Sequence, residues 1–143
     1  MATYDESIRS ITLDADATLA TYTGVPGLPG SANPNNGKQY RFVIVTGAHQ
    51  CGLADHDSPY PIGVLQNKPQ VTGAAATVAI RGVSLCEAGD TITAGQAIVV
   101  DDSIQGTAVP VGTTGAGTVV VGIALGGAAV GQLVPVLLGR FGA

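Results

Sequence analysis

The stretch ATVAIRGVSLCEAGDTITAGQAIVVDD, residues 76–102, consists of short runs of Val, Ile, Leu and Ala separated by turns that contain glycine. PIGVLQNKP (residues 61–69) and TVVVGIALGGAAVGQLVPVLL (residues 118–138) repeat this pattern on either side. Short apolar runs with glycines between them are typical of the strands and turns of an all-β protein. The region from Ser103 to Gly139 contains no charged side chain. These stretches therefore predict a structural β module rather than an enzyme.

The composition limits the possible partners of the chain. Its 143 residues fit one domain, and charged residues make up only 11% of them, less than half of the usual ~25% in soluble proteins. Much of the surface must therefore carry small polar side chains or lie against another chain. The net charge is −4 and the six Lys and Arg residues form no run, which argues against binding to nucleic acid or to an anionic membrane.

The apolar runs predict about seven to nine short strands, the number expected for a small β-barrel or β-sandwich. The predicted strands are 40–46, 62–66, 77–80, 83–86, 91–93, 97–100, 107–111, 118–124 and 133–138, with short extended pairings at 11–13 and 19–22. Gly82 is expected to mark a bulge or bend between two of these runs. Residues 49–60 are polar and are predicted to form a loop. An ion pair of little energy is expected between Arg81 and Glu87 at the rim.

The N-terminal part of the chain differs from the rest. Half of residues 24–37 (GVPGLPGSANPNNG) are Gly or Pro, which excludes a helix or an inner strand and indicates a linker or surface loop. The first 20 residues hold four acids and one arginine. We therefore expect an extended N-terminal arm with its Gly/Pro-rich loop at residues 1–37, followed by a β-barrel or β-sandwich domain at residues 38–143.

One polar loop gathers side chains that bind metals or act as nucleophiles, namely His49, Cys51, Asp55, His56 and Asp57. Zinc takes nitrogen and thiolate ligands, but the spacing of these residues matches no standard site. The favoured interpretation is a polar loop in which Asp55 and Asp57 accept the hydrogen bonds of turns. We therefore predict no catalytic residue, no cofactor and no metal ion, with a cysteine or metal enzyme as an alternative.

The two cysteines, Cys51 and Cys86, form no metal-binding pair, and isolated thiols of this kind are usually buried in a reducing compartment. A single disulfide between them remains open. Residues 117–138 are long enough to span a bilayer. However, Gln132 and Pro135 interrupt this segment, it lacks an aromatic belt, and no Lys or Arg lies near its N-terminal end, where the nearest charge is Asp102.

Residues 88–98 (AGDTITAGQAI) resemble the hairpins of biotinyl and lipoyl carrier domains. Those domains present a modified lysine in a tight Met-Lys-Met or Asp-Lys-Ala hairpin. Lys68 lies instead in Asn67-Lys68-Pro69, which does not match. A small β-barrel binding or carrier module of a non-viral assembly is therefore the alternative function.

A second resemblance covers about residues 61–139. Its ordered motifs are GVLQNKP (63–69), VAIRGV (78–83), AGDTITAGQAIVVDDSIQGTAVPV (88–111) and VGIALGGAAVGQLVPVLL (121–138). This set resembles the capsid decoration proteins, also called cement or head-stabilisation proteins, of tailed bacteriophages. The first 60 residues match nothing comparable.

The resemblance implies a structural virion protein that binds the outer surface of the expanded capsid and stabilises it by clamping adjacent capsomers. It implies the major capsid protein and further copies of this chain as partners, in a homotrimer, without nucleic acid, membrane or small-molecule substrate. Such a protein is made in the host cytoplasm and ends on the outer capsid surface. The arm is expected to contact the capsid, through Tyr4, Ile8, Ile11, Leu13, Leu19 and Tyr22, while the apolar C-terminal half forms the trimer contacts.

Overall fold

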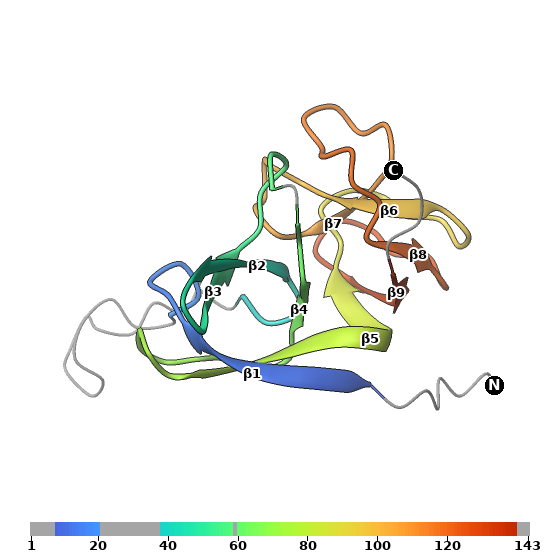
Figure 1. The fold of residues 1–143 in the computed structure, drawn as a ribbon. Coiled ribbons are helices and arrows are strands. Elements are labelled where there is room, and N and C mark those ends of the chain that lie inside the picture. Colours follow the sequence, from blue (N-terminus) through green and yellow to red (C-terminus); the bar gives the residue numbers. More distant parts are fainter. Residues whose placement is uncertain (1–7, 21–37, 59, 140–143) are drawn as a thin grey trace.

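The computed structural model describes residues 8–20, 38–58 and 60–139 of the chain, and all regular elements in these ranges are strands (Figure 1). In chain order they are β1 (Arg9–Ala15), β2 (Phe42–Gly47), β3 (Gln50–Leu53), β4 (Gly63–Leu65), β5 (Ala75–Glu87), β6 (Ala97–Val100), β7 (Ala108–Pro110), β8 (Gly122–Ala124) and β9 (Leu133–Leu138). These nine strands belong to one sheet, so the prediction of an all-β fold with about seven to nine short strands is confirmed.

Five of the strands form a closed ring of pairings, which we call the first ring. β1 pairs with both β3 and β5, while β2 pairs with β3 and β4, and β4 pairs with β5. Only the β1–β3 pairing is parallel. Closure of this kind protects the edges of strands that an open sheet would expose. The interior is filled by a compact set of apolar side chains: Ala15, Leu19, Val43, Cys51, Leu65, Ala76 and Val78.

The remaining strands form a second half around the far end of β5. β5 pairs with β9, and β8, β6 and β7 follow in that order. An isolated bridge between Ala88 and Ala108 brings β7 back to the end of β5. The core of this half includes Ile98, Val134 and Val136, together with Phe42 and Val64 from the first ring. This second core therefore draws side chains from both halves, and Figure 1 shows β5 running through both.

β5 serves both halves because it changes direction at Gly82. The φ angle of this residue is +94°, which side chains with a Cβ rarely adopt. β1 pairs with β5 as far as Arg81, and β9 pairs with it from Gly82 onward. The predicted bend at Gly82 is confirmed.

Several predicted segments differ from the structure. The predicted strand 118–124 is shortened to β8 (Gly122–Ala124). Leu19 and Ala20 of the predicted pairing at 19–22 belong to no strand, and residues 21 and 22 lie outside the described residues. The predicted loop 49–60 contains β3, which the sequence did not indicate because Gly52 breaks its apolar pattern. A Cβ at Gly52 would overlap the carboxylate of Asp16, which would have to leave its place in the turn after β1. The predicted strand 91–93 is reduced to a single bridge between Ile92 and Ala128.

The predicted N-terminal arm also needs correction, because residues 8–20 belong to the folded domain. β1 is paired on both sides, and Ala15, Leu19 and Ala20 are buried. Asp16 closes the turn after β1, since its Oδ1 accepts hydrogen bonds from the backbone N–H and the hydroxyl of Thr18. The domain therefore begins before residue 38. Residues 1–7 and 21–37 of the predicted arm lie outside the described residues.

Candidate interaction surfaces

The structure separates the predicted capsid-contact residues into three groups. Ile8 and Ile11 are exposed at 45% and 39%, so both are available to a partner. Leu13 is partly buried against the core of the first ring. Leu19 is fully buried in that core, so its assignment as a contact residue is wrong for the domain folded in this way. Tyr4 and Tyr22 lie outside the described residues.

The start of β1 and the middle of β5 form an exposed two-stranded ribbon with a concentration of positive charge. Arg9 lies directly opposite Arg81 in the ladder, and both residues are exposed. Like charges in directly opposed positions are destabilising. Neither guanidinium makes a hydrogen bond or ion pair with any residue that the structure describes. Together with Ile8, Ile11 and Ile80 (37% exposed), these arginines define what we call the ribbon surface. It suits an acidic partner with some apolar character.

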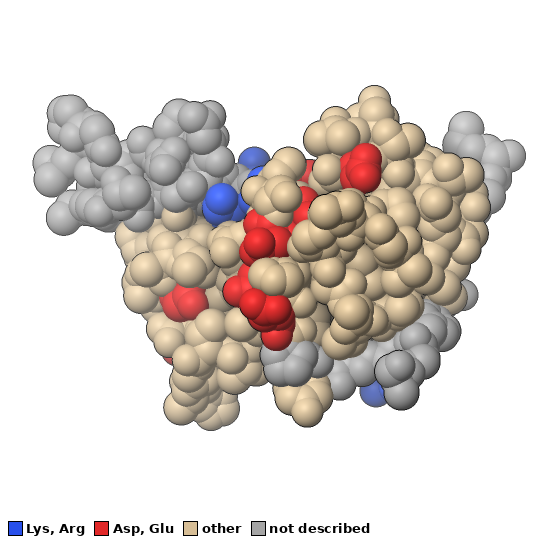
Figure 2. All heavy atoms as spheres, turned by 90° about the horizontal axis from the view of Figure 1, so that it is seen from above, with Lys and Arg blue, Asp and Glu red and all other residues tan. Residues whose placement is uncertain are grey.

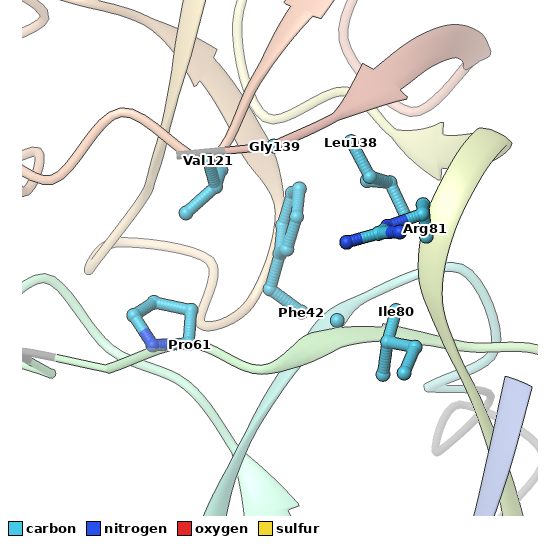
Figure 3. Close-up of a pocket in the computed structure, with 8 residues that line it drawn as sticks. Phe42, Pro61, Ile80, Arg81, Val121, Leu138 and Gly139 are labelled. Atoms are coloured by element: carbon cyan, nitrogen blue, oxygen red, sulfur yellow. The ribbon is translucent and has the colours of Figure 1, made fainter. Parts of the chain in front are cut away.

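A pocket of about 230 Å³ adjoins the ribbon surface where the two halves meet (Figure 3). Its lining comes from both halves: Phe42, Pro61, Gly63, Ile80, Arg81, Val121, Leu138 and Gly139. The guanidinium of Arg81 points toward Phe42 in Figure 3. Pockets for small molecules usually measure ~300–1,000 Å³. This pocket is smaller and suits a single side chain of a partner.

A second polar region lies between the loop that follows β3 and the loop that follows β6. His56 contacts the Oδ1 atoms of Asp57 and Asp102, in each case at 3.0 Å. The contact between Nδ1 and Asp102 is close enough for an ion pair but lacks the alignment of a regular hydrogen bond. The interaction with Asp102, followed by the charges of Asp57 and Asp55, raises the pKa of His56. Figure 2 shows acidic side chains gathered in a band across this face of the molecule.

The five candidate ligands of the polar loop are not brought together. Cys51 is fully buried in the first ring, and His49 is exposed in the turn between β2 and β3, where its φ angle is +56°. Asp55 has the predicted structural role, since its Oδ1 accepts hydrogen bonds from the N–H of Asp57 and the hydroxyl of Ser58. Among the described residues, no group of three or more His, Cys, Asp or Glu is arranged to hold a metal ion.

Both thiols are buried and unpaired, so the open question of a disulfide is answered by two free cysteines. Burial is the main cause that raises the pKa of Cys51 to about 11, and the charges of Asp16 and Asp14 add to it. Burial alone raises the pKa of Cys86. The thiolate is the nucleophilic form of cysteine, and both sites disfavour it.

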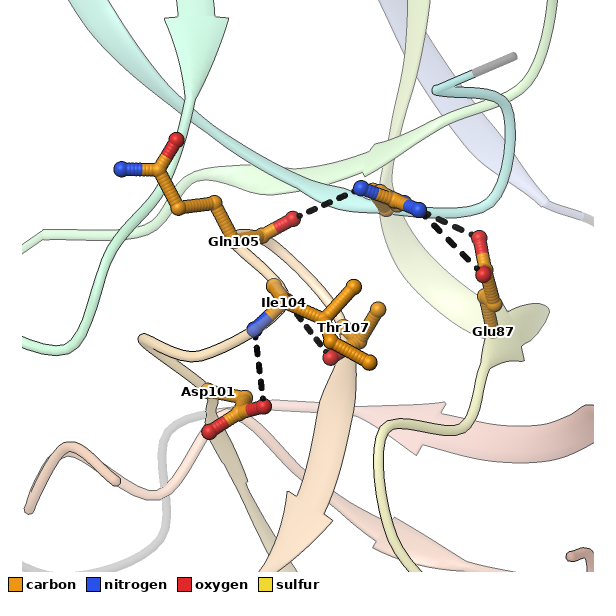
Figure 4. Close-up of polar contacts among 6 residues, drawn as sticks. Glu87, Asp101, Ile104, Gln105 and Thr107 are labelled. Carbon is orange, nitrogen blue, oxygen red and sulfur yellow. Dashed lines mark hydrogen bonds and ion pairs between the residues drawn. The ribbon is translucent and has the colours of Figure 1, made fainter. Parts of the chain in front are cut away.

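An ion pair inside the junction stabilises the arrangement of the two halves. Arg41 Nε donates to Glu87 Oε2 at 2.9 Å, and Nη2 donates to Oε1 at 3.3 Å. The third nitrogen, Nη1, donates to the carbonyl of Gln105 at 3.3 Å, which ties in the loop after β6 (Figure 4). The predicted pair between Arg81 and Glu87 is therefore wrong. Residues six positions apart in an extended strand lie roughly 20 Å from each other, beyond the reach of an ion pair.

The structure also bears on two further interpretations of the sequence, a membrane-spanning segment and a carrier hairpin. The part of the chain that the structure describes contains no helix long and apolar enough to cross a membrane. The stretch that resembles a carrier hairpin contributes the bridge at Ile92 and a turn before β6. Lys68 lies exposed in the connection between β4 and β5.

No family model and no curated protein sequence matches this chain. The search of solved structures finds the N base of the head fiber gp8.5 of bacteriophage phi29, with a TM-score of 0.57 and 17% sequence identity. The match covers 96% of this chain and 100% of the phage chain. At this identity the likeness concerns the fold. The chain thus shares the fold of the N base of this bacteriophage head fiber.

Proposed function

We propose that this protein is a structural component of a bacteriophage virion that binds the outer surface of the capsid and stabilises it by clamping adjacent capsomers. The observation that carries this proposal is the fold, which is shared over nearly the whole chain with a protein of a phage head fiber. The ordered motifs between residues 61 and 139 support it independently. The proposed role is structural and requires no catalysis.

The proposed contact with the major capsid protein is the ribbon surface. Its exposed isoleucines provide apolar area, and its two guanidinium groups, which pair with none of the described residues, provide the charge to bind acidic side chains. Arginine binds carboxylates with two parallel hydrogen bonds, which adds geometric specificity. Bringing a carboxylate to this site would also relieve the repulsion between Arg9 and Arg81. Tyr4 and Tyr22 remain part of the proposed contact.

Clamping requires that one oligomer of this protein bind more than one capsomer. We propose a homotrimer, in which each copy contributes one ribbon surface. When several weak contacts are linked in one oligomer they bind together, and the avidity of the oligomer exceeds the affinity of a single contact by roughly 10²–10⁴-fold. A small contact area on each copy is then sufficient for stable attachment to the head.

Cosedimentation with purified empty expanded heads tests this proposal. The wild-type protein should sediment with the heads, and the double variant Arg9→Ala/Arg81→Ala should bind at least tenfold more weakly. Lys68→Ala is the matched control, because it removes one exposed cation from another part of the surface. Wild-type protein that stays in the supernatant would refute the function. A double variant that binds like the wild type would refute only the ribbon surface as the contact.

A further inference from the structure

The second half presents an outward face made almost entirely of apolar side chains. Along the β5–β9 ladder, Ser84 and Cys86 lie opposite Val136 and Val134, and all four are buried. The alternate positions point to the other side of the sheet. These outward pairs are Val83 with Leu137, Leu85 with Pro135, and Glu87 with Leu133. On the other side of β9, Ile123 of β8 lies opposite Leu137 and extends the row.

This outer face lacks the polar residues that such a position normally carries. An antiparallel sheet with one solvated face usually alternates apolar residues inside with polar residues outside. Here Leu85 and Leu133 are each 43% exposed, and Val130, in the turn before β9, is 57% exposed. Among the described residues of this face the one charged side chain is Glu87, which is already paired with Arg41.

We infer that this outer face, formed by Val83, Leu85, Ile123, Leu133, Pro135 and Leu137, is the interface between copies of this chain. The inference rests on the proposed function in one respect, since it supplies the interface of the proposed oligomer. Contiguous exposed apolar patches mark interaction sites. A partner must match the face in charge, and only an equally uncharged surface does so. Another copy of the chain offers such a surface, whereas the ribbon surface with its two arginines suits a charged partner.

The dimensions of the face agree with this occupant. The paired segments of β5 and β9 are roughly 20 Å long and β8 is about 10 Å long, so three such strands about 4.8 Å apart have a footprint of ~240 Å². The relief of the side chains and the flanking turn at Val130 enlarge the accessible area. A stable interface buries about 800 Å² on each partner, with an apolar centre and a more polar rim. The outer face supplies the apolar centre of an interface of that size.

Analytical ultracentrifugation at micromolar concentration tests the inference without any capsid. The wild-type chain should sediment as an oligomer, and Leu85→Glu/Leu133→Glu should sediment as a monomer with an unchanged circular dichroism spectrum. Val45→Glu is the matched control, because Val45 is 56% exposed on β2 in the other half. This control should remain oligomeric. If the glutamate variant fails to fold, the milder Leu133→Ser should still raise the dissociation constant at least tenfold.

Two results would overturn the inference: a monomeric wild-type protein, or a folded double variant that keeps the oligomeric state. These outcomes differ from a failure of the proposed function. An oligomeric wild-type protein that does not bind heads would refute the proposed function and leave the interface intact.

Discussion

Several glycines of this protein are required by the atoms that lie next to them. Gly63 of β4 lies opposite Val43 of β2, and β5 passes close behind it. A Cβ at this position would overlap the carbonyl oxygen of Ala79. The obstacle is backbone, which cannot rotate away as a flexible side chain can. The sequence motif GVLQNKP therefore contains a residue that sets the distance between two strands.

Gly63→Ala should lower the free energy of unfolding by about 1–3 kcal/mol, the usual cost of forcing an extra methyl group into a packed site. Urea denaturation measures this change. Gly126→Ala is the matched control, since its Cβ would lie at an ordinary 3.4 Å from the ring of Pro135. The control should stay within about 0.5 kcal/mol of the wild type. Equal midpoints for both variants would contradict the close approach of β4 and β5.

At the scale of the strands, the sequence predicted those that are apolar runs bounded by turn residues. The run that became β9 is apolar throughout, and the two runs that became β5 are rich in Val, Ile and Leu. β3 was not predicted, because its four residues include a glycine and only Cys51 and Leu53 contribute side chains to the core. β1 was predicted only in part, since most of its side chains are exposed and its partners are distant in the chain. The ribbon surface was missed for the same reason, because only the pairing of β1 with β5 brings Arg9 opposite Arg81.

The position of β1 changes what a truncation can test. Deleting residues 2–22 would remove an arm from a folded domain if the whole segment were peripheral. In the structure it removes a strand that closes the first ring, together with the buried side chains of Ala15 and Leu19. We therefore expect the truncated chain to lose cooperative thermal unfolding, as measured by circular dichroism. Deletion of residues 2–7 alone is the control and should leave the melting curve intact. A cooperative transition in the longer deletion would show that the ring does not need β1.

At the scale of the whole molecule, the two halves meet through one shared apolar core and through polar contacts at its border. The ion pair between Arg41 and Glu87 lies at one part of this border, and His56 lies at another. His56 belongs to the loop after β3, whereas Asp102 belongs to the loop after β6. The loop that leads to β8 also contacts this site, because a Cβ at Gly117 would lie 2.9 Å from the carbonyl oxygen of His56. Protonation of one imidazole therefore affects the contact between the halves.

The raised pKa of His56 predicts a pH dependence of stability. The acidic groups that face the imidazole are Asp102, Asp57 and Asp55, and they favour its charged form in the folded state. A group whose pKa is higher when folded stabilises the protein fully below its ordinary pKa of about 6.5 and loses this effect as the pH rises through the folded value. As the pH rises above about 6.5, the melting temperature of the wild type should therefore fall more than that of His56→Gln. His49→Gln is the matched control and should keep the wild-type fall, because His49 lies in the exposed turn between β2 and β3. Parallel pH curves for the wild type and His56→Gln would mean that the contact with Asp102 does not join the two halves in solution.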